Sequence, residues 1–486
     1  MQIIQNEKDL IQHHAKFSSF NISISALKKA IDSVDPVVLI NRAIKLIDNK
    51  RLVITDVNDV KYYFDLKDYE SFHIFGAGKA TARMAKSLME SLTIEISSGA
   101  ITIPYNEKVL PDKLIVIEAG HPIPDENSIR GTKQIIDLLK KIENKSLVFV
   151  LISGGSSSLL CCPLDGLKLQ SKQEITKLLL QSGASIQEIN TVRKHLSKIK
   201  GGRLPKYVNG KSKIITLILS DVVGDDLSTI GSGPTVGDNS TFANCKEILE
   251  RYELWNPNNH ENAIDILNVR KVIADGNKGI IEETPSLNDN LYKNVSNILI
   301  GNNEIACKSA MNELMNFGIK TKYLGSDINS EAKVFGKKLA ELLKFQRTRS
   351  FNNKKGDDSF AYVMGGETVV NLKSKNFNNK VDGKGGRNQE AIVSSINYLQ
   401  DIRNLEDFII ICCGTDGIDG NSESAGGLVT PSTLEYIKRK KINVNSFLNS
   451  HDSETLLKRV YSHLVTGRTG TNVNDIAIIC KQKRRM

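Results

Sequence analysis

The chain has 486 residues, of which 40% are hydrophobic and 25% are charged, and its formal net charge is +10. This length exceeds the size at which one hydrophobic core stops growing, so two domains are expected. No stretch reaches the roughly 18 consecutive apolar residues that cross a bilayer, which argues against a membrane protein. The positive charges are spread along the chain without interleaved aromatic residues, which argues against a nucleic-acid partner and suits an anionic substrate.

The sequence also indicates a cytoplasmic location. Its first twenty residues lack the basic start, the apolar centre and the small-residue cleavage site of a secretion signal. The seven cysteines form an odd set without a C-x-x-C pair, and residues 161–162 and 412–413 lie in or beside apolar runs. We therefore interpret the cysteines as buried thiols in a reducing compartment.

Short apolar runs, which predict strands, alternate along the chain with helical patterns. The predicted strands are 71–76, 113–120, 147–153, 214–221, 297–302, 360–367, 408–416 and 475–480, and the clearest helices are 79–92, 127–142 and 186–202. This alternation is typical of α/β folds, so we predict two Rossmann-like α/β domains with largely parallel sheets. Asn- and Asp-rich stretches at 236–245 and 350–359 are predicted to be exposed connections. The first of them sets the predicted domains at 1–240 and 241–486.

Several predicted strands end in Gly-rich or Ser-rich loops, where open α/β sheets bind their ligands. In 76-GAGKA-80 the glycines permit a tight turn into a helix, and Lys79 adds a positive charge where the helix start already favours anions. In 153-SGGSSS-158 the hydroxyl and backbone N–H groups of Ser153, Gly154, Gly155 and Ser156 could form a nest for a phosphate or a carboxylate. A plain Gly-Ser turn and a nucleophilic serine are the alternatives.

The pattern at 186–202 predicts a helix with one apolar and one cationic face. Asn190, Arg193, Lys194 and Lys200 fall in one sector of this predicted helix, and Gly201 and Gly202 would end it. Such a face either binds an anion or is simply solvated, and the spacing alone leaves both readings open.

Carboxylates follow two of the predicted strands, in 220-SDVVGDD-226 and 414-GTDGIDG-420. Hard oxygen ligands at strand ends suit Mg²⁺, so Asp221, Asp225 and Asp416 are the candidate metal ligands. The alternative is that the aspartates only cap turns and helices.

Two further loops in the C-terminal half carry polar side chains typical of ligand contacts. The turn 383-GKGGRNQEA-391 delivers Arg387, Asn388 and Glu390 to the start of a helix. The loop 466-TGRTGTNVND-475, with Thr471 and Asn472, is of the kind that contacts phosphates or a nucleoside. We expect both loops to take part in binding.

The loops described above, taken in chain order, resemble the motifs of the class II glycerate 2-kinases, whose C-terminal half is a MOFRL-type domain. Other carrying motifs are AGHPIPDENS, GGET, SGPTVGD and SAGG, and together they run from about residue 70 to residue 480. The resemblance implies an ATP-dependent, Mg²⁺-requiring kinase with two α/β domains and the active site in the cleft between them. It also implies that Lys79 and Arg387 act on the transferring phosphoryl group.

We therefore expect a glycerate kinase that transfers the γ-phosphoryl group of ATP to the 2-hydroxyl of D-glycerate. The alternatives are a kinase that forms 3-phosphoglycerate, or an NAD(P)H-dependent hydroxypyruvate reductase. The reductase would need a full dinucleotide fingerprint, which 76-GAGKA-80 lacks. Which loop binds ATP and which binds glycerate is open, and a homodimer is one option for the oligomeric state.

Overall fold

The computed structural model describes residues 3–208, 210–256, 263–352, 359–372, 383–400 and 407–483. The chain divides into two compact units: Leu39–Gly301, here called the parallel unit, and Met1–Val38 with Asn302–Met486, here called the mixed unit. Among the described residues, no helix is long and apolar enough to cross a membrane. The predicted connection at 350–359 lies largely outside the described residues.

The parallel unit is built on a six-stranded sheet with the order β6-β5-β4-β7-β8-β9, in which every pair is parallel. Its strands are β4 (Ser71–Ala77), β5 (Ser98–Pro104), β6 (Ile115–Ala119), β7 (Ser146–Ile152), β8 (Lys213–Leu219) and β9 (Val295–Gly301). All seven residues of β7 are buried, as expected for a central strand covered on both faces. The predicted parallel α/β sheet is therefore confirmed for this unit.

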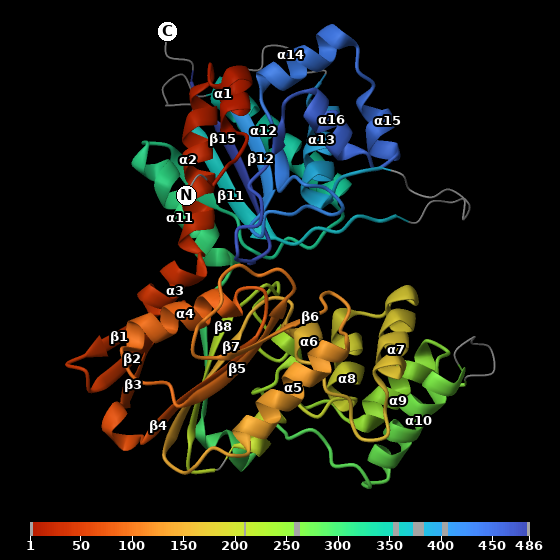
Figure 1. Ribbon diagram of the computed structural model, residues 1–486. Helices are drawn as coiled ribbons and strands as arrows, with labels where there is room; N and C mark the ends of the chain where they lie inside the picture. The colour runs from red at the N-terminus through yellow and green to blue at the C-terminus, as the bar shows by residue number, and fades with distance from the viewer. Residues whose placement is uncertain are drawn as a thin grey trace. The chain divides into compact units, whose positions relative to one another are not determined.

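The strand order reverses between β4 and β7, which gives the sheet a topological switch point. The chain runs from β4 outward to β5 and β6, and then returns to β7 on the other side of β4. Because crossovers are right-handed, α4 (Thr81–Leu92) and α5 (Glu126–Leu139) lie on opposite faces, and α5 packs on β5 and β6 (Figure 1). Loops at the carboxyl ends of β4 and β7 therefore meet where such sheets bind ligands.

Further elements complete the parallel unit. A small antiparallel sheet consists of β1 (Ile44–Ile47), β2 (Arg51–Thr55) and β3 (Lys61–Asp65). The remaining helices are α6 (Ser156–Leu159), α7 (Leu169–Gln181), α8 (Ile186–His195), α9 (Phe242–Arg251) and α10 (Ala263–Asn277), while α3 (Pro36–Ala43) crosses the division between the units. Helices α7 to α10 bury their own apolar cluster, around Leu179, Ile189 and Phe242.

The mixed unit has a six-stranded sheet with the order β10-β11-β15-β12-β13-β14. Its strands are β10 (Lys320–Tyr323), β11 (Phe360–Gly366), β12 (Phe408–Gly414), β13 (Gly426–Val429), β14 (His463–Leu464) and β15 (Asp475–Lys481). Only β10 and β11 pair in parallel, so the prediction of a largely parallel sheet is wrong here. The reason is that β15, the last strand of the chain, inserts antiparallel between β11 and β12.

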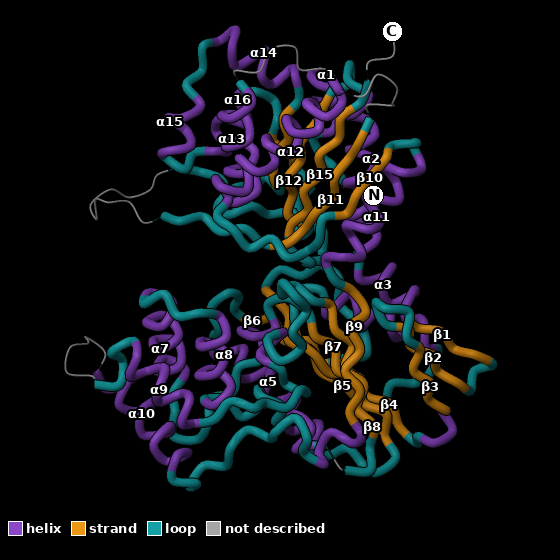
Figure 2. The backbone as a smooth tube through the Cα atoms, turned by 180° about the vertical axis from the view of Figure 1, so that it is seen from behind, coloured by secondary structure: helices purple, strands orange, loops and turns teal. Residues whose placement is uncertain are grey.

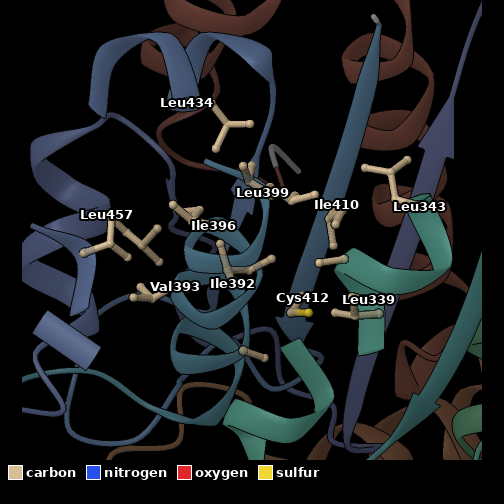
Figure 3. Close-up of a cluster of buried hydrophobic side chains, with 14 of the residues drawn as sticks. Leu339, Leu343, Ile392, Val393, Ile396, Leu399, Ile410, Cys412, Leu434 and Leu457 are labelled. Carbon is tan, nitrogen blue, oxygen red and sulfur yellow. The ribbon is translucent and has the colours of Figure 1, made fainter. Parts of the chain in front are cut away.

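Helices cover both faces of this sheet (Figures 1 and 2). One face carries α2 (Ser18–Ser33) and α11 (Asn303–Asn316). The other face carries α12 (Ala332–Asn352), α13 (Arg387–Leu399) and α16 (Ser453–Arg459). The remaining helices of the unit are α1 (Glu7–His14), α14 (Pro431–Lys440) and α15 (Val444–Asn449). Figure 3 shows Ile392 and Ile396 of α13 in a core that also contains Leu339, Ile410 and Leu457. The first 38 residues therefore fold with the C-terminal part of the chain.

The predicted boundary at residue 240 does not match this division. Strand β9, at 295–301, pairs with β8, so the chain stays in the parallel unit long after residue 240. The Asn-rich stretch at 236–245 is instead a connection within that unit, and Asp238 inside it is buried. A polar composition thus marked a loop but not the end of a domain.

All eight predicted strands are present, with ends that differ by a few residues. The predicted helix 186–202 is partly wrong, because α8 ends at His195 and the chain then forms an isolated bridge between Ser197 and Pro163. Gly201 and Gly202 do have positive φ, but their N–H groups donate to the carbonyls of Ser232 and Gly233. Residues 196–202 therefore run along a neighbouring loop.

His14 makes the stability of the mixed unit depend on pH. Its side chain is 1% exposed, Nε2 lies 2.8 Å from the carbonyl oxygen of Tyr461, and Nδ1 lies 2.9 Å from the Thr430 hydroxyl. Nε2–H therefore donates and Nδ1 accepts, which requires a neutral ring. Burial lowers the pKa of His14 to about 4.

We therefore expect stability to be lost as the pH falls from about 6.5 to about 4, because the unfolded chain then binds a proton that the folded chain rejects. The contribution of His14 is about 3 kcal/mol. Urea unfolding followed by circular dichroism at several pH values should show the difference between wild type and His14→Gln shrinking across this window. A difference independent of pH would contradict the prediction.

Candidate active site

Two loops at the switch point of the parallel sheet are joined by hydrogen bonds. The N–H of Lys79, just before α4, donates to the carbonyl of Gly154 after β7 at 2.8 Å. In return, the hydroxyl of Ser153 accepts the N–H of Ala80 at 3.1 Å. A Cβ on Gly78 would lie 2.1 Å from that hydroxyl oxygen, so only glycine fits between the loops. The predicted Lys79 and Ser153 loops are thus brought together.

Lys79 and His121 flank the glycine at the centre of the second loop. Gly155 has a φ of +83°, and a Cβ there would lie 2.7 Å from Cδ2 of His121 and 3.4 Å from Cγ of Lys79. Both side chains therefore lie close to the position that a Cβ of Gly155 would take. Lys79 is partly exposed, at a loop before a helix start, where backbone N–H groups favour anions.

The serines of 153–158 divide into structural and candidate binding groups. The hydroxyl of Ser153 is used by the start of α4, as described above, and that of Ser158 donates to the carbonyl of Gly155 at 3.0 Å. The hydroxyl of Ser157 contacts that of Ser232 at 2.9 Å. Within the described part of the chain, the buried hydroxyl of Ser156 has no hydrogen-bond partner. The loop is therefore mostly a packed turn that contains one buried hydroxyl without a partner among the described residues.

The predicted basic face at 186–202 is not solvated. Asn190, Lys194 and Lys200 are 4%, 7% and 1% exposed, and Arg193 is partly buried. Asn190 accepts a hydrogen bond from the Ser232 hydroxyl at 3.1 Å, and Lys194 pairs with Asp238 at 3.3 Å. Of the two readings that the spacing left open, burial rules out the solvated face.

Sequence reasoning missed a further buried cation, Lys172 of α7, which is 4% exposed. Its charge lies close enough to those of Arg193 and Lys200 to affect the pKa values of this group. The sequence did contain a signal for this residue. Lys172 has the helical spacing of Leu169 and Ile175 on the buried face of α7, and lysine is rare on the apolar face of a helix.

The aspartates after β8 mostly shape a turn. Asp226 accepts hydrogen bonds from the N–H and hydroxyl of Ser228, each at 3.0 Å, and from the hydroxyl of Thr229 at 2.6 Å. Asp225 has a φ of +54°, and Asp221 lies two residues beyond the strand. Across the described residues, no group of three or more His, Cys, Asp or Glu side chains could hold a metal ion. The predicted metal ligands Asp221, Asp225 and Asp416 therefore stay predictions.

In the mixed unit, Arg387 opens α13 and is held between carboxylates. Its guanidinium donates to both oxygens of Asp475, with Nη2 to Oδ1 at 3.1 Å, and Nη1 lies 3.0 Å from Oε1 of Glu367. Burial alone would lower the pKa of Arg387, but the carboxylates raise it above its ordinary value. The Arg387 side chain as a whole is still about one third exposed.

More than one carboxyl group lies near the single cation, Arg387, at the start of α13. Asp419 accepts the backbone N–H groups of Asn388 at 3.1 Å and Gln389 at 2.8 Å. Burial, and then the nearby charge of Asp475, raise the pKa of Asp419 to about 7 against the effect of these hydrogen bonds. Burial likewise raises the pKa of Asp475. The carboxyl groups thus carry more potential negative charge than Arg387 neutralises.

The other predicted residues of this unit have mainly structural contacts. Asn388 donates through Nδ2 to Asp419 at 3.3 Å, Glu390 pairs with His451 at 2.7 Å, and Thr471 donates to the Val34 carbonyl at 2.6 Å. The side-chain oxygen of Asn472 accepts the N–H of Asn474 at 3.2 Å. Sequence reasoning missed Asp475, although a charged residue that opens a wholly apolar strand was its signal.

Known families match both parts of the chain. Residues 23–267 match the family described as a domain of unknown function, DUF4147, and residues 360–475 match the MOFRL family. The first match lies mostly in the parallel unit, which carries the Lys79 loop. The second covers β11 to β14 and ends at the first residue of β15, with Arg387 inside it.

Relatives and a solved structure extend the similarity to nearly the whole chain. A glycerate 2-kinase of Pyrococcus horikoshii is 38% identical and covers 92% of this chain and 97% of its own. The crystal structure of a glycerate kinase from Thermotoga maritima has a TM-score of 0.77 at 34% identity and covers 94% of this chain and 98% of its own. An Agrobacterium vitis relative with the provisional name hydroxypyruvate reductase is 35% identical over 84% of this chain and 86% of its own.

The pairing of Arg387 predicts unequal effects of its two partners on stability. Asp475 is buried, whereas the Glu367 side chain is 43% exposed. Asp475→Asn should lower the free energy of unfolding by about 3 kcal/mol, because it breaks a buried ion pair. Glu367→Gln should cost less than about 1 kcal/mol, because water screens that pair. Denaturant unfolding of both variants measures the difference, and equal losses would contradict the assignment.

Proposed function

Because the chain belongs to the glycerate kinase family with a MOFRL C-terminal domain, we infer that it is a glycerate 2-kinase. The single observation that carries this inference is the 38% identity to a glycerate 2-kinase over 92% of the chain. The reaction moves a phosphoryl group to the 2-hydroxyl of glycerate and yields 2-phosphoglycerate. Its donor, its metal and the roles of individual residues are proposals.

We propose that Lys79 stabilises negative charge on the transferring phosphoryl group. Support comes from its place at the switch point, one residue before the cap of α4, where backbone N–H groups favour anions. The two-way hydrogen bonding between its loop and the Ser153 loop holds the backbone in place before the substrate binds. Preorganised charge of this kind lowers the barrier to phosphoryl transfer, which depends on positioning and electrostatics.

Arg387 has the second proposed role, again on the phosphoryl oxygens. The bidentate contact with Asp475 fixes its guanidinium plane, and the partly exposed side chain leaves N–H groups for a phosphate. The simpler alternative is that Arg387 only pairs with carboxylates and stabilises α13. Kinetic measurements separate the two roles, as set out below.

We further propose ATP as the donor with Mg²⁺, which would neutralise phosphate charge when bound. Asp416 is the candidate ligand in the mixed unit, whereas both oxygens of Asp475 already accept hydrogen bonds from Arg387. Mg²⁺ usually takes one or two protein carboxylates with water and phosphate, and the acidic excess around Arg387 favours a cation. Asp221 and Asp225 remain the candidates in the parallel unit.

The remaining predictions on partners and location stand as proposals. All seven cysteines are free and buried, which suits a reducing compartment and supports the cytoplasm. No observation favours the hydroxypyruvate reductase, since the loop after β4 has a lysine and a helix start but no third glycine of the dinucleotide fingerprint. Two expectations stay predictions. One is that the protein has no nucleic-acid partner, and the other is that it forms a homodimer.

The first test is the identity of the product. We expect D-glycerate, ATP and Mg²⁺ to give 2-phosphoglycerate as the initial product in phosphorus NMR, and a chelator to abolish the reaction. Initial formation of 3-phosphoglycerate would contradict the position of transfer. Oxidation of NADH by hydroxypyruvate at a comparable rate would support the reductase instead.

The second test is a double-mutant cycle on Lys79 and Arg387. Each change to Ala should lower kcat by about 100-fold or more, with a smaller effect on KM for glycerate, because a charge-stabilising group is lost in the transition state. If both act on one phosphoryl group, the double variant should lose less than the product of the single losses. Near-normal kcat in Lys79→Ala would refute its role.

The matched control for the cycle is Asp475→Asn, which disturbs Arg387 but keeps its charge. If Arg387 is only structural, Arg387→Ala and Asp475→Asn should lower the melting temperature alike and leave kcat unchanged. If Arg387 contacts the phosphoryl group, Arg387→Ala should lose more activity than Asp475→Asn at a comparable loss of stability.

A further inference from the structure

The parallel unit buries three cationic side chains together: Lys172 of α7, Arg193 of α8 and Lys200 beyond it. Lys172 is 4% exposed, Lys200 is 1% exposed and Arg193 is partly buried. The Nζ of Lys172 donates to the carbonyl of Leu196 at 3.3 Å, which ties α7 to the end of α8. We call these three residues the cation cluster.

No carboxylate in the described part of the chain forms an ion pair with the cation cluster. Lys200 donates only to neutral oxygens, the Ser157 hydroxyl at 3.5 Å and the Gly231 carbonyl at 3.3 Å. Two neighbours in the same segment do have a carboxylate partner. Lys194 pairs with Asp238 at 3.3 Å, and His195 lies 2.7 Å from Glu283. Buried Arg203 also donates to backbone carbonyls, but the charges of Glu282 and Glu283 lie near enough to act on its pKa. No carboxylate among the described residues acts on the cluster in this way.

Such burial is costly for the folded protein. Burial lowers the pKa of Lys172 to about 8 and moves that of Lys200 well below its ordinary value, and the neighbouring cations add to both effects. A buried charge is normally paired, since desolvation of an unpaired ion costs several kcal/mol. Packing alone gives no reason for three cations here, because a methionine would fill the place of Lys172 on the apolar face of α7.

The cluster borders hydroxyl groups that can also hold an oxyanion. The Ser157 hydroxyl, which accepts from Lys200, contacts Ser232, and Ser232 in turn donates to Asn190. The buried Ser156 hydroxyl, unpartnered within the described residues, belongs to the same loop. Cations and hydroxyl groups thus converge at the carboxyl end of β7, two residues from the glycine that Lys79 flanks.

We propose that the cation cluster binds the carboxylate of the hydroxy-acid acceptor, and that Lys172 is a specificity-determining residue of this site. The proposal rests on the proposed function. In a 2-hydroxy acid the reacting oxygen sits on the carbon next to the carboxylate, so the carboxylate must be held beside the group that handles the phosphoryl. Buried cations suit a small planar anion, whereas a triphosphate arrives with its own metal counter-charge.

The test compares Lys172→Met with Lys177→Met, which removes the same charge from an exposed position of the same helix. In melting experiments without nucleotide, D-glycerate should stabilise wild type and Lys177→Met, and Lys172→Met should need at least about tenfold more glycerate for the same shift. In kinetics, Lys172→Met should raise KM for glycerate about tenfold or more and leave KM for ATP unchanged.

A structural role for Lys172 predicts a different pattern. Without any ligand, Lys172→Met should melt no lower than wild type, because it removes a buried charge. A lower melting temperature together with normal glycerate binding would overturn the proposal. Lys172→Gln, which keeps a donor for the Leu196 carbonyl, repeats the measurement with that contact retained, and normal glycerate binding in this variant would also overturn it.

Two further outcomes separate this proposal from the proposed function. If Lys172→Met raises KM for ATP rather than for glycerate, or if inorganic phosphate protects wild type but glycerate does not, the cluster holds a phosphate and the carboxylate proposal is wrong. If wild type forms no phosphorylated product while glycerate still protects it in a Lys172-dependent way, the kinase assignment fails and the carboxylate site stands.

Discussion

The hydrogen bonds between the loops after β4 and β7 are the interaction on which the candidate site of the parallel unit depends. The Lys79 N–H and the Gly154 carbonyl fix one loop against the other, and Ser153 closes the second contact through Ala80. Because the strand order reverses between these two strands, no helix crosses over their carboxyl ends. The lysine, the glycine and the serine hydroxyls are therefore held at one place by the backbone, before any substrate is present.

The two units handle charge in opposite ways. In the mixed unit one arginine is surrounded by carboxyl groups, and burial raises the pKa of Asp419 to about 7, so this group is only partly ionised near neutral pH. In the parallel unit the cation cluster forms no ion pair with a carboxylate of the described residues. Each imbalance has an energetic cost in the folded protein, and each is removed by a ligand of the opposite charge.

The sequence predicted strands better than it predicted their pairing. Every predicted strand exists, because wholly apolar runs such as 147–152 are buried on both faces. The direction of β15 could not be predicted, since the apolar run 476–480 fits a parallel or an antiparallel neighbour equally well. The helix at 186–202 was predicted too long, because the bridge of Ser197 to Pro163 is a tertiary contact that local periodicity does not encode.

For the candidate site, the glycine-rich loops were readable because positive φ and close approach restrict those positions to glycine. Lys172 and Asp475 were not found, because their significance comes from partners 21 or more residues away, Arg193 in one case and Arg387 in the other. The spacing of residues 186–202 did not show whether their cationic side chains face solvent. The fold answers this for Lys200, which is 1% exposed.

The mixed unit is made from both ends of the chain, with α2 packed on β12 and β15. This arrangement sets the order of events during synthesis, when the chain emerges from its N-terminus. All six strands of the parallel sheet have been made once residue 301 is reached, whereas α2 must wait for β15 at 475–481 before its partner sheet is complete. Until then α2 has only part of its native cover, from α11 and β12, so a nascent chain that stalls before β15 would leave the side of α2 that faces β15 open to chaperones and proteases.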